Sequence, residues 1–209
     1  MTYRSHADLG GREESRRVVP EPDGAQFHAP WEARAMALTV AMGASGLWNI
    51  DESRAARETL PDYERLSYYQ IWLDALQKLV DERGILREPS PLAPRMLRAA
   101  DVAGVLKKGA PTLRTSTRAP RFKLKDRIRT IGGDLPHHTR LPHYARDKLG
   151  RIERIHGMHV FPDSNAHGGG ESPQWLYTVC FESGELFGGE GAREALISID
   201  AFESYLGPA

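Results

Sequence analysis

The sequence predicts an α+β protein: an N-terminal extended arm and a helical domain, followed by a C-terminal SH3-like β-barrel. Two observations carry this prediction. Apolar residues recur at helical spacing between residues 30 and 108, and short alternating runs separated by Gly, Asp, Asn and Pro fill the chain after residue 120. Successive short strands without helices between them favour a small closed barrel, because closure removes exposed sheet edges. We therefore predict four segments: an arm over 1–29, a helical domain over 30–108, a linker over 109–120 and the barrel over 121–209.

Composition limits the class of protein. The 209 residues suffice for one large domain or two small ones. Lys and Arg number 28, as do Asp and Glu, so the charge balance does not call for a nucleic-acid partner. No apolar run approaches the ~18 residues of a membrane span, and the N-terminus lacks the apolar core of a secretory signal. The single cysteine, Cys180, predicts a cytoplasmic protein and a core position within an apolar run, not a nucleophile.

The first elements after the arm are short helices. Residues 1–29 are rich in Gly, Pro, Arg and Glu and show neither helical nor strand periodicity, so we expect them to be ordered only by packing on another surface. Pro30 suits a first helical turn and predicts a helix over 31–42. Asp51 is a suitable N-cap for a second helix over 52–60, which Pro61 ends.

Two further helices are expected before the linker. Asp62 is the predicted cap of the third helix, and Gly84 closes it. The fourth is predicted over Pro91–Lys108. The apolar stripe of the third helix consists of Leu66, Tyr69, Trp72, Leu73, Leu76, Leu79 and Val80.

A basic stretch connects the two halves. Residues 107–129 hold nine Lys or Arg against one acid, Asp126, while Pro111 and Pro120 prevent a helix. A solvated connector and a strip that lies on an acidic partner surface are both compatible with this pattern.

Short strands fill the last part of the chain. We predict strands over Phe122–Ile131, Gly150–Ile155, Trp175–Phe181 and Ala195–Ile199. The glycine runs Gly168–Gly170 and Gly188–Gly191 do not join a strand to a helix, so they are interpreted as hairpin glycines and not as phosphate-binding loops.

The sequence contains no recognised catalytic or metal motif. Eight histidines are present, but there is no HExxH, no CxxC and no GxSxG. We therefore predict no metal site built by this chain alone. Arg54, Arg140 and Arg146 remain as groups suited to holding an oxyanion, because a guanidinium is always charged and donates in a planar fork. Tyr68 lies off the centre of the apolar stripe, where its hydroxyl could face a cleft. Ordinary surface arginines and a structural tyrosine are the alternatives.

Several longer motifs resemble one family. They are HADLGG at 6–11, PWE at 30–32, DESRAARETL at 51–60, SYYQIWL at 67–73, HTRLPHYARDKLGRI at 138–152, HGMHVFPDSNAHGGGESPQWLYTV at 156–179, GELFG at 184–188 and DAFESYL at 200–206. In this order and spacing the chain resembles the β subunit of nitrile hydratase along essentially its whole length. The block containing Tyr144, Arg146, Lys148 and Gly150, followed by FPD, is highly specific.

The resemblance implies an enzyme complex of the hydro-lyase class, which adds water to a nitrile to give an amide. It implies Fe(III) or Co(III) bound by a Cys-rich motif of a partner α subunit, with two cysteines oxidised to sulfenic and sulfinic acids. This chain would then bind no metal itself. The expected assembly is αβ or α2β2, acting on a small-molecule nitrile, with neither nucleic acid nor membrane as a partner.

The matching motifs also imply roles for single residues. Arg54 and Arg140 would hydrogen-bond the oxidised cysteine ligands, and Tyr68 would point at the substrate or the attacking water. Ile50, Ser53 and Trp72 would line the substrate pocket, and because Ser53 stands where a bulky aromatic is common, a wider pocket is expected. The implied supporting network consists of Glu58, His138, Tyr144 and Arg146, with His137 as the alternative to His138.

Other functions fit parts of the sequence. In thiocyanate hydrolase the two halves occur on separate chains, whereas here they are fused. Activator or metallochaperone proteins resemble mainly the barrel half, whereas this chain carries both halves. A scaffold that has lost activity would not need to keep Arg54, Arg140 and Tyr68. These differences favour a nitrile hydratase β subunit.

Overall fold

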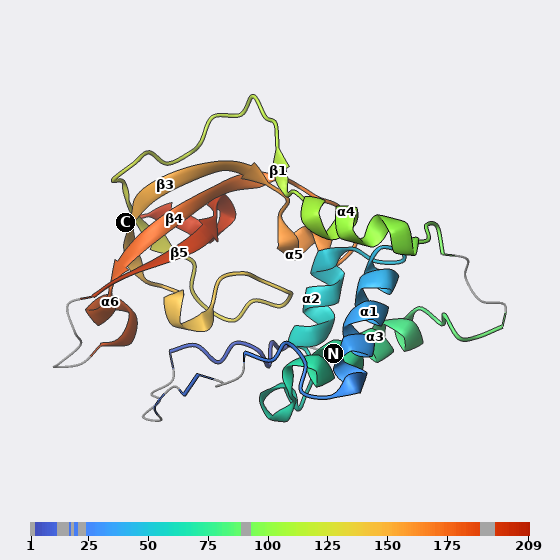
Figure 1. The fold of residues 1–209 in the computed structure, drawn as a ribbon. Coiled ribbons are helices and arrows are strands. Elements are labelled where there is room, and N and C mark those ends of the chain that lie inside the picture. Colours follow the sequence, from blue (N-terminus) through green and yellow to red (C-terminus); the bar gives the residue numbers. More distant parts are fainter. Residues whose placement is uncertain (1–2, 12–16, 18, 21–23, 89–92, 189–194) are drawn as a thin grey trace. The chain divides into compact units, whose positions relative to one another are not determined.

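The computed structural model describes residues 3–11, 17, 19–20, 24–88, 93–188 and 195–209. The chain divides into two compact units. The helical unit comprises Arg12–Gly109 with Arg4–Ala7, and the sheet unit comprises Ala110–Ala209 with Met1–Tyr3 and Asp8–Gly11. In Figure 1 the helices of the first unit run from blue to green, and the strands of the second run from yellow-green to red.

The helical unit is built around three helices. These are α1 (Pro30–Gly43), α2 (Ile50–Glu58) and α3 (Tyr68–Glu82), with α3 packed against both others (Figure 1). The short 3-10 turn η1 (Tyr63–Arg65) lies between α2 and α3, and the turn η2 (Ala99–Asp101) and the short helix α4 (Val102–Lys108) follow α3. The main core of the unit consists of Trp48, Ala56, Leu60, Ala75, Leu76 and Leu79.

Helix α1 begins with Pro30 in its first turn, as predicted. The predicted cap of α2 is wrong, because Asn49 and not Asp51 caps this helix. The side chain of Asn49 accepts hydrogen bonds from the backbone of Asp51 and Glu52, each at 2.9 Å, and Glu52 accepts in return from the backbone N–H of Asn49. This reciprocal box satisfies donors that a cap at Asp51 would leave open, because Arg54 would then stand where the box requires an acceptor.

The start of α3 also differs from the prediction. Asp62 precedes the short η1 turn, and Ser67 is the N-cap of α3, where its backbone N–H donates to Gln70 Oε1 at 2.8 Å. Within the predicted stripe, Tyr69, Leu76 and Leu79 are buried, whereas Leu73 is exposed.

The predicted helix over Pro91–Lys108 is much shorter in the structure. Its first residues, Pro91 and Leu92, lie outside the described residues, and residues 93–98 contain no helix. Pro94 has no N–H to donate, and the N–H of Arg95 donates to the carbonyl of Ser45 at 2.9 Å. The helix therefore begins only at η2 and α4.

The sheet unit contains an antiparallel sheet. Its strands are β1 (Leu113–Arg114), β2 (Arg127–Thr130), β3 (Leu149–His159), β4 (Gln174–Glu182), β5 (Leu196–Phe202) and β6 (Leu206–Pro208). The hydrogen-bonded order is β5-β4-β3-β2-β6, and β1 pairs with the far end of β3. Figure 1 shows β3, β4 and β5 running together as a curved layer. The fully buried side chains include Ile128, Ile152, Tyr177, Val179, Phe181 and Tyr205.

The predicted closed barrel is corrected to an open sheet. The ladder ends at β5 on one side and at β6 on the other, and no pairing joins these two strands among the described residues. The three-residue turn η4 (Glu203–Tyr205) leads directly from β5 into β6. The strand after this turn, β6, pairs with β2.

The strand predicted over Phe122–Ile131 is shortened to β2. Lys125 adopts a left-handed φ of 72°, and the N–H of Lys123 donates to Asp126 Oδ2, so a turn replaces the first half of the strand. Leu124 is consequently exposed, whereas Ile128 is buried on β2.

Cys180 lies on the outward side of β4, not in the core. The strand alternates, and the buried positions are Tyr177, Val179 and Phe181, so Cys180 is left half-buried on the other face.

Two short helices were not predicted: α5 (Pro162–Asn165) and α6 (Ser183–Phe187). The glycine run at 188–191 lies outside the described residues from 189 onward.

The described residues before Pro30 form no helix or strand, and their role as an arm stays a prediction. None of the described helices combines the length and apolar character needed to cross a membrane.

Candidate functional site

In the sheet unit, Arg140 lies in a loop that is held firmly from inside. Its backbone N–H donates to the hydroxyl of Tyr205 at 3.1 Å, and the next residue, Leu141, is buried. The side chain of Arg140 is exposed. The loop therefore presents a guanidinium at the surface from a fixed backbone position.

A buried carboxylate supports this anchor. Asp163, on α5, is 5% exposed, and the hydroxyl of Tyr205 donates to its Oδ1. His137 Nδ1 lies 3.6 Å from the other carboxylate oxygen. Burial raises the pKa of Asp163, and burial together with the charge of Asp163 raises the pKa of Tyr205. Tyr205 therefore stays protonated and donates to Asp163 while it accepts from Arg140.

His138 is fully buried behind the same loop. Its backbone N–H donates to Nε2 of His167 at 3.0 Å, and its ring Nδ1 lies 3.4 Å from the hydroxyl of Tyr3. Burial and, after it, the neighbouring His137 and His138 lower the pKa of His167. A neutral His167 is the form that can accept this hydrogen bond.

The side chains of Arg146 and Tyr144 contact neighbouring backbone segments. The guanidinium of Arg146 donates to the carbonyls of Leu141 and Gly133, and lies 3.6 Å from Asp8. The ring of Tyr144 packs so closely on residues 10–11 that a Cβ on Gly10 would lie 2.6 Å from it. Both side chains therefore fasten the loop and residues 8–11 to the sheet unit.

The remaining predicted site residues lie in the helical unit. Arg54 Nη1 donates to Oδ1 of the buried Asp51 at 3.1 Å, one turn earlier on α2. Ile50, at the start of the same helix, is exposed, whereas Ser53 is buried. Glu58 ends the helix, and its carbonyl accepts from the backbone N–H of His6.

Aromatic residues of α3 face the helix that carries Ser53. Tyr68 is 64% exposed, and its ring lies 5.5 Å from that of Trp72. The guanidinium carbon of Arg57 lies 4.4 Å from the centre of the Trp72 ring, and Nη2 of Arg57 donates to Ser53 Oγ at 3.2 Å. Burial lowers the pKa of Arg57. The structure thus brings Ser53, Trp72 and Tyr68 together, with Arg57 as an additional member.

Several of these residues are not evident as site residues from the sequence. Arg57 could have been found from its spacing, because it lies four residues after Ser53 on one helix face. Asp163 and Tyr205 are 42 residues apart, and no local pattern links them. Among the described residues, no group of three His, Cys, Asp or Glu is placed to hold a metal ion.

Comparisons with known proteins cover both units. The family profile described as nitrile hydratase beta subunit, N-terminal, matches residues 3–119, and the corresponding C-terminal profile matches residues 111–208. The low-molecular weight cobalt-containing nitrile hydratase subunit beta of Rhodococcus rhodochrous is 33% identical, over 97% of this chain and 98% of the relative. The nitrile hydratase subunit beta of Pseudomonas putida is 31% identical, over 97% and 98%.

A solved structure is also similar in part. The match to the recombinant apo-enzyme of thiocyanate hydrolase from Thiobacillus thioparus covers 44% of this chain and 78% of that chain, with 27% identity and a TM-score of 0.39. The two family profiles and the full-length relatives lead to one conclusion: the chain belongs to the nitrile hydratase beta subunit family.

Proposed function

We propose that this chain is the β subunit of a hetero-oligomeric nitrile hydratase, which pairs with an α subunit as αβ or α2β2 and converts nitriles to amides. The observation that supports this proposal is the similarity along the whole length, with identity of 33% over 97% of the chain. The assembly would act in the cytoplasm, where a single half-buried thiol such as Cys180 stays reduced.

The metal is proposed to belong to the partner. The described residues of this chain offer no cluster that fits Fe(III) or Co(III), and Cys180 lies on a strand with Arg151 and Ser198 opposite it. The name of the Rhodococcus rhodochrous relative includes cobalt, which supports a metal centre somewhere in such an assembly. This chain would therefore act through its own side chains on groups held by the α subunit.

Arg54 and Arg140 are the proposed donors to oxidised cysteines of the α subunit. A guanidinium beside a sulfenate or sulfinate oxygen forms a charge-assisted hydrogen bond worth about 1.5–3 kcal/mol. The anchored backbone of Arg140 and the ion pair of Arg54 with Asp51 fit this role, because both limit the movement of the guanidinium. Fixed cations of this kind favour the anionic form of the oxidised sulfur and keep the ligands in place.

Tyr68 is the proposed contact to the substrate or the attacking water, and Ile50, Ser53 and Trp72 the proposed pocket lining. The exposed hydroxyl-bearing ring of Tyr68 beside Trp72 supports this assignment. We further propose that Glu58, His138, Tyr144 and Arg146 act as supporting residues, the last three by holding the loop of Arg140. The four-segment division and the wrapping of the partner by residues 1–29 belong to the same proposal.

The test is co-expression of this chain with an α subunit, followed by an assay of acrylonitrile hydration. Arg54→Lys and Arg140→Lys should each lower kcat by about a hundredfold, because an ammonium cannot reproduce the planar fork. Size-exclusion chromatography should show that the subunits stay associated.

Arg129→Lys is the matched control, since Arg129 is also a surface arginine with one carboxylate partner, Asp147. Its rate should equal that of the wild type. Wild-type rates in both Arg54→Lys and Arg140→Lys would contradict the role proposed for the two arginines. Hydrolysis of thiocyanate, without hydration of the nitrile, would indicate a thiocyanate hydrolase instead.

A further inference from the structure

A second polar cluster lies in the sheet unit, formed by residues that the proposed hydration site does not use. It surrounds a depression of about 460 Å³ between the start of β4, the η4 turn and the segment before β2. We call it the Arg118 pocket. Its lining consists of Arg118, Arg121, Ser172, Pro173, Gln174, Glu203 and Ser204.

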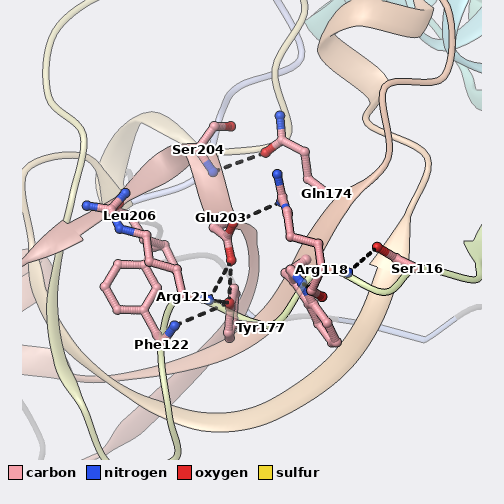
Figure 2. A network of polar contacts seen from close by, with 10 residues as sticks. Ser116, Arg118, Arg121, Phe122, Gln174, Tyr177, Glu203, Ser204 and Leu206 are labelled. Carbon is pink, nitrogen blue, oxygen red and sulfur yellow. Dashed lines mark hydrogen bonds and ion pairs between the residues drawn. The ribbon is translucent and has the colours of Figure 1, made fainter.

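Glu203 is the one carboxylate of this lining, and its oxygens are already engaged (Figure 2). Oε1 accepts from Arg118 Nη2 at 2.9 Å. Oε2 accepts from the hydroxyl of Tyr177 at 2.6 Å and from the backbone N–H of Arg121 at 3.0 Å. Burial and Glu203 raise the pKa of Tyr177, so the phenol stays a donor. Little acceptor capacity of Glu203 is left for a ligand.

Gln174 has a fixed orientation. Its Oε1 accepts from the backbone N–H of Ser204 at 3.1 Å. Figure 2 shows the amide oxygen turned toward Ser204 and the nitrogen turned the other way. Because the oxygen is engaged, the NH2 group is the part of this side chain that can serve a ligand, and it can only donate.

Arg118 is anchored at its backbone and open at its side chain. Its N–H donates to Ser116 Oγ at 3.0 Å, and its carbonyl accepts from Nε1 of Trp175, also at 3.0 Å. The side chain is 54% exposed. A guanidinium has five N–H donors, and within the described residues Glu203 is the carboxylate that pairs with it, so a second edge of the planar fork remains for another acceptor.

We propose that the Arg118 pocket binds a small oxyanion, held by the Arg118 guanidinium and the Gln174 amide, with the hydroxyls of Ser172 and Ser204 as further donors. The lining offers donors, whereas its one carboxylate, Glu203, has little acceptor capacity left. Two arginines against one glutamate leave a net positive charge on the lining. A carboxylate, a phosphate or a sulfate has the matching chemistry. This site is independent of the hydration of nitriles.

The experiment is isothermal titration of the purified full chain, in the assembly that it forms with its partner. The probes are inorganic phosphate, sulfate and butyrate, each at constant ionic strength set with chloride. Wild-type protein should bind at least one of them saturably. Binding of phosphate or sulfate alone identifies an inorganic oxyanion, and binding of butyrate identifies an organic carboxylate.

Two variants test the residues. Arg118→Gln should weaken binding by about tenfold or more, through the loss of a charge-assisted fork. Gln174→Glu keeps an oxygen that can accept from Ser204 but replaces the donor with a negative charge, so it should weaken binding at least as much. Arg129→Gln removes a comparable surface cation, 45% exposed and paired with Asp147, and should leave binding unchanged.

The proposal is overturned if none of the three anions binds saturably, or if Arg129→Gln weakens binding as much as the two pocket variants. Should Arg118→Gln fail to fold, Gln174→Glu decides the outcome alone. Because the readout is binding and not turnover, a negative result here leaves the proposed enzymatic role untouched, and a failed hydration assay leaves this site untouched.

Discussion

The hydroxyl of Tyr205 accepts a hydrogen bond from the backbone N–H of Arg140 at 3.1 Å. The same hydroxyl donates to Asp163, and the side chains of Tyr205 and Asp163 are both buried. A residue of the η4 turn, between β5 and β6, thus fixes a loop 65 residues earlier, and the loop carries an exposed arginine. The backbone position of Arg140 therefore depends on the buried side chain of Tyr205.

Replacement of Tyr205 by Phe should therefore have two effects. Removing the hydroxyl leaves the buried Asp163 and the N–H of Arg140 without this partner, so the free energy of unfolding should fall by about 1–3 kcal/mol. The rate of nitrile hydration should fall while KM stays nearly constant, because the loop loses its anchor and not a substrate contact. Urea unfolding and steady-state kinetics measure the two effects. A variant as stable and as active as the wild type would contradict the positioning role.

His167 should make stability depend on pH in mildly acidic solution. Its pKa in the folded protein lies below the usual 6.5, so the folded state binds fewer protons than the unfolded state in this window. The contribution is fully present above pH 6.5 and is lost as pH falls through the lowered pKa. Protonation also removes the acceptor that His167 offers to the N–H of His138.

The measurement is the urea midpoint between about pH 7.5 and about pH 5, a range that spans the ordinary histidine pKa. His167→Gln keeps a hydrogen-bond acceptor without titrating, so the fall in stability should become shallower. His159, whose pKa burial also lowers, still contributes in the variant. The exposed His143 provides the control, and His143→Gln should follow the wild-type curve. An identical slope in wild type and His167→Gln would contradict the assignment.

The sequence predicted those helices and strands that depend on residues within the element itself. Pro30 marked the start of α1, and alternation located β3 and β4. The errors came from competing local chemistry. Asn49 and Asp51 are both acceptable caps, and only the reciprocal bond with Glu52 decides between them. The alternation of residues 122–130 resembles a strand, but the left-handed Lys125 places a turn within it.

The surroundings of the site could not be predicted in the same way. The motif HTR drew attention to Arg140. Its backbone partner Tyr205 lies on η4, and Asp163, which holds Tyr205, lies on α5. Arg57 was the exception, because it shares a helix with Ser53 at a spacing of four residues. Side chains that act through tertiary contacts need the fold before they can be identified.

Gly150 has no room for a side chain. A Cβ at this position would lie 2.6 Å from Val179 Cγ1 and 2.8 Å from Phe181 Cε1, on the buried face of β4. Gly150→Ala should therefore lower the free energy of unfolding by about 1–3 kcal/mol, as overpacking of a core does. Gly184→Ala is the control, because nothing lies within 4 Å of the added Cβ, and it should be neutral or slightly stabilising. Equal stability of the two variants would show that the sheet yields at Gly150.

Arg57 should control the position of Trp72 in the helical unit. Its guanidinium lies 4.4 Å from the ring centre and is tied to Ser53 Oγ, so it holds the indole from one side. Arg57→Gln removes a partly desolvated cation–π contact worth about 1 kcal/mol. If Trp72 lines the substrate pocket as proposed, KM for the nitrile should rise by about fivefold, the equivalent of that energy, with a smaller change in kcat.

The control for Arg57→Gln is Arg65→Gln, which removes the charge of an exposed arginine at the end of η1 in the same unit. Arg57→Lys separates the two parts of the interaction, because it keeps the charge but loses the planar face that stacks on the indole. If the KM of Arg57→Lys is close to that of the wild type, the effect is due to the charge. If it is close to that of Arg57→Gln, the effect is due to stacking on the indole. An unchanged KM in Arg57→Gln, with unchanged stability, would mean that Trp72 is positioned by α3 alone and that the arginine is incidental to the pocket.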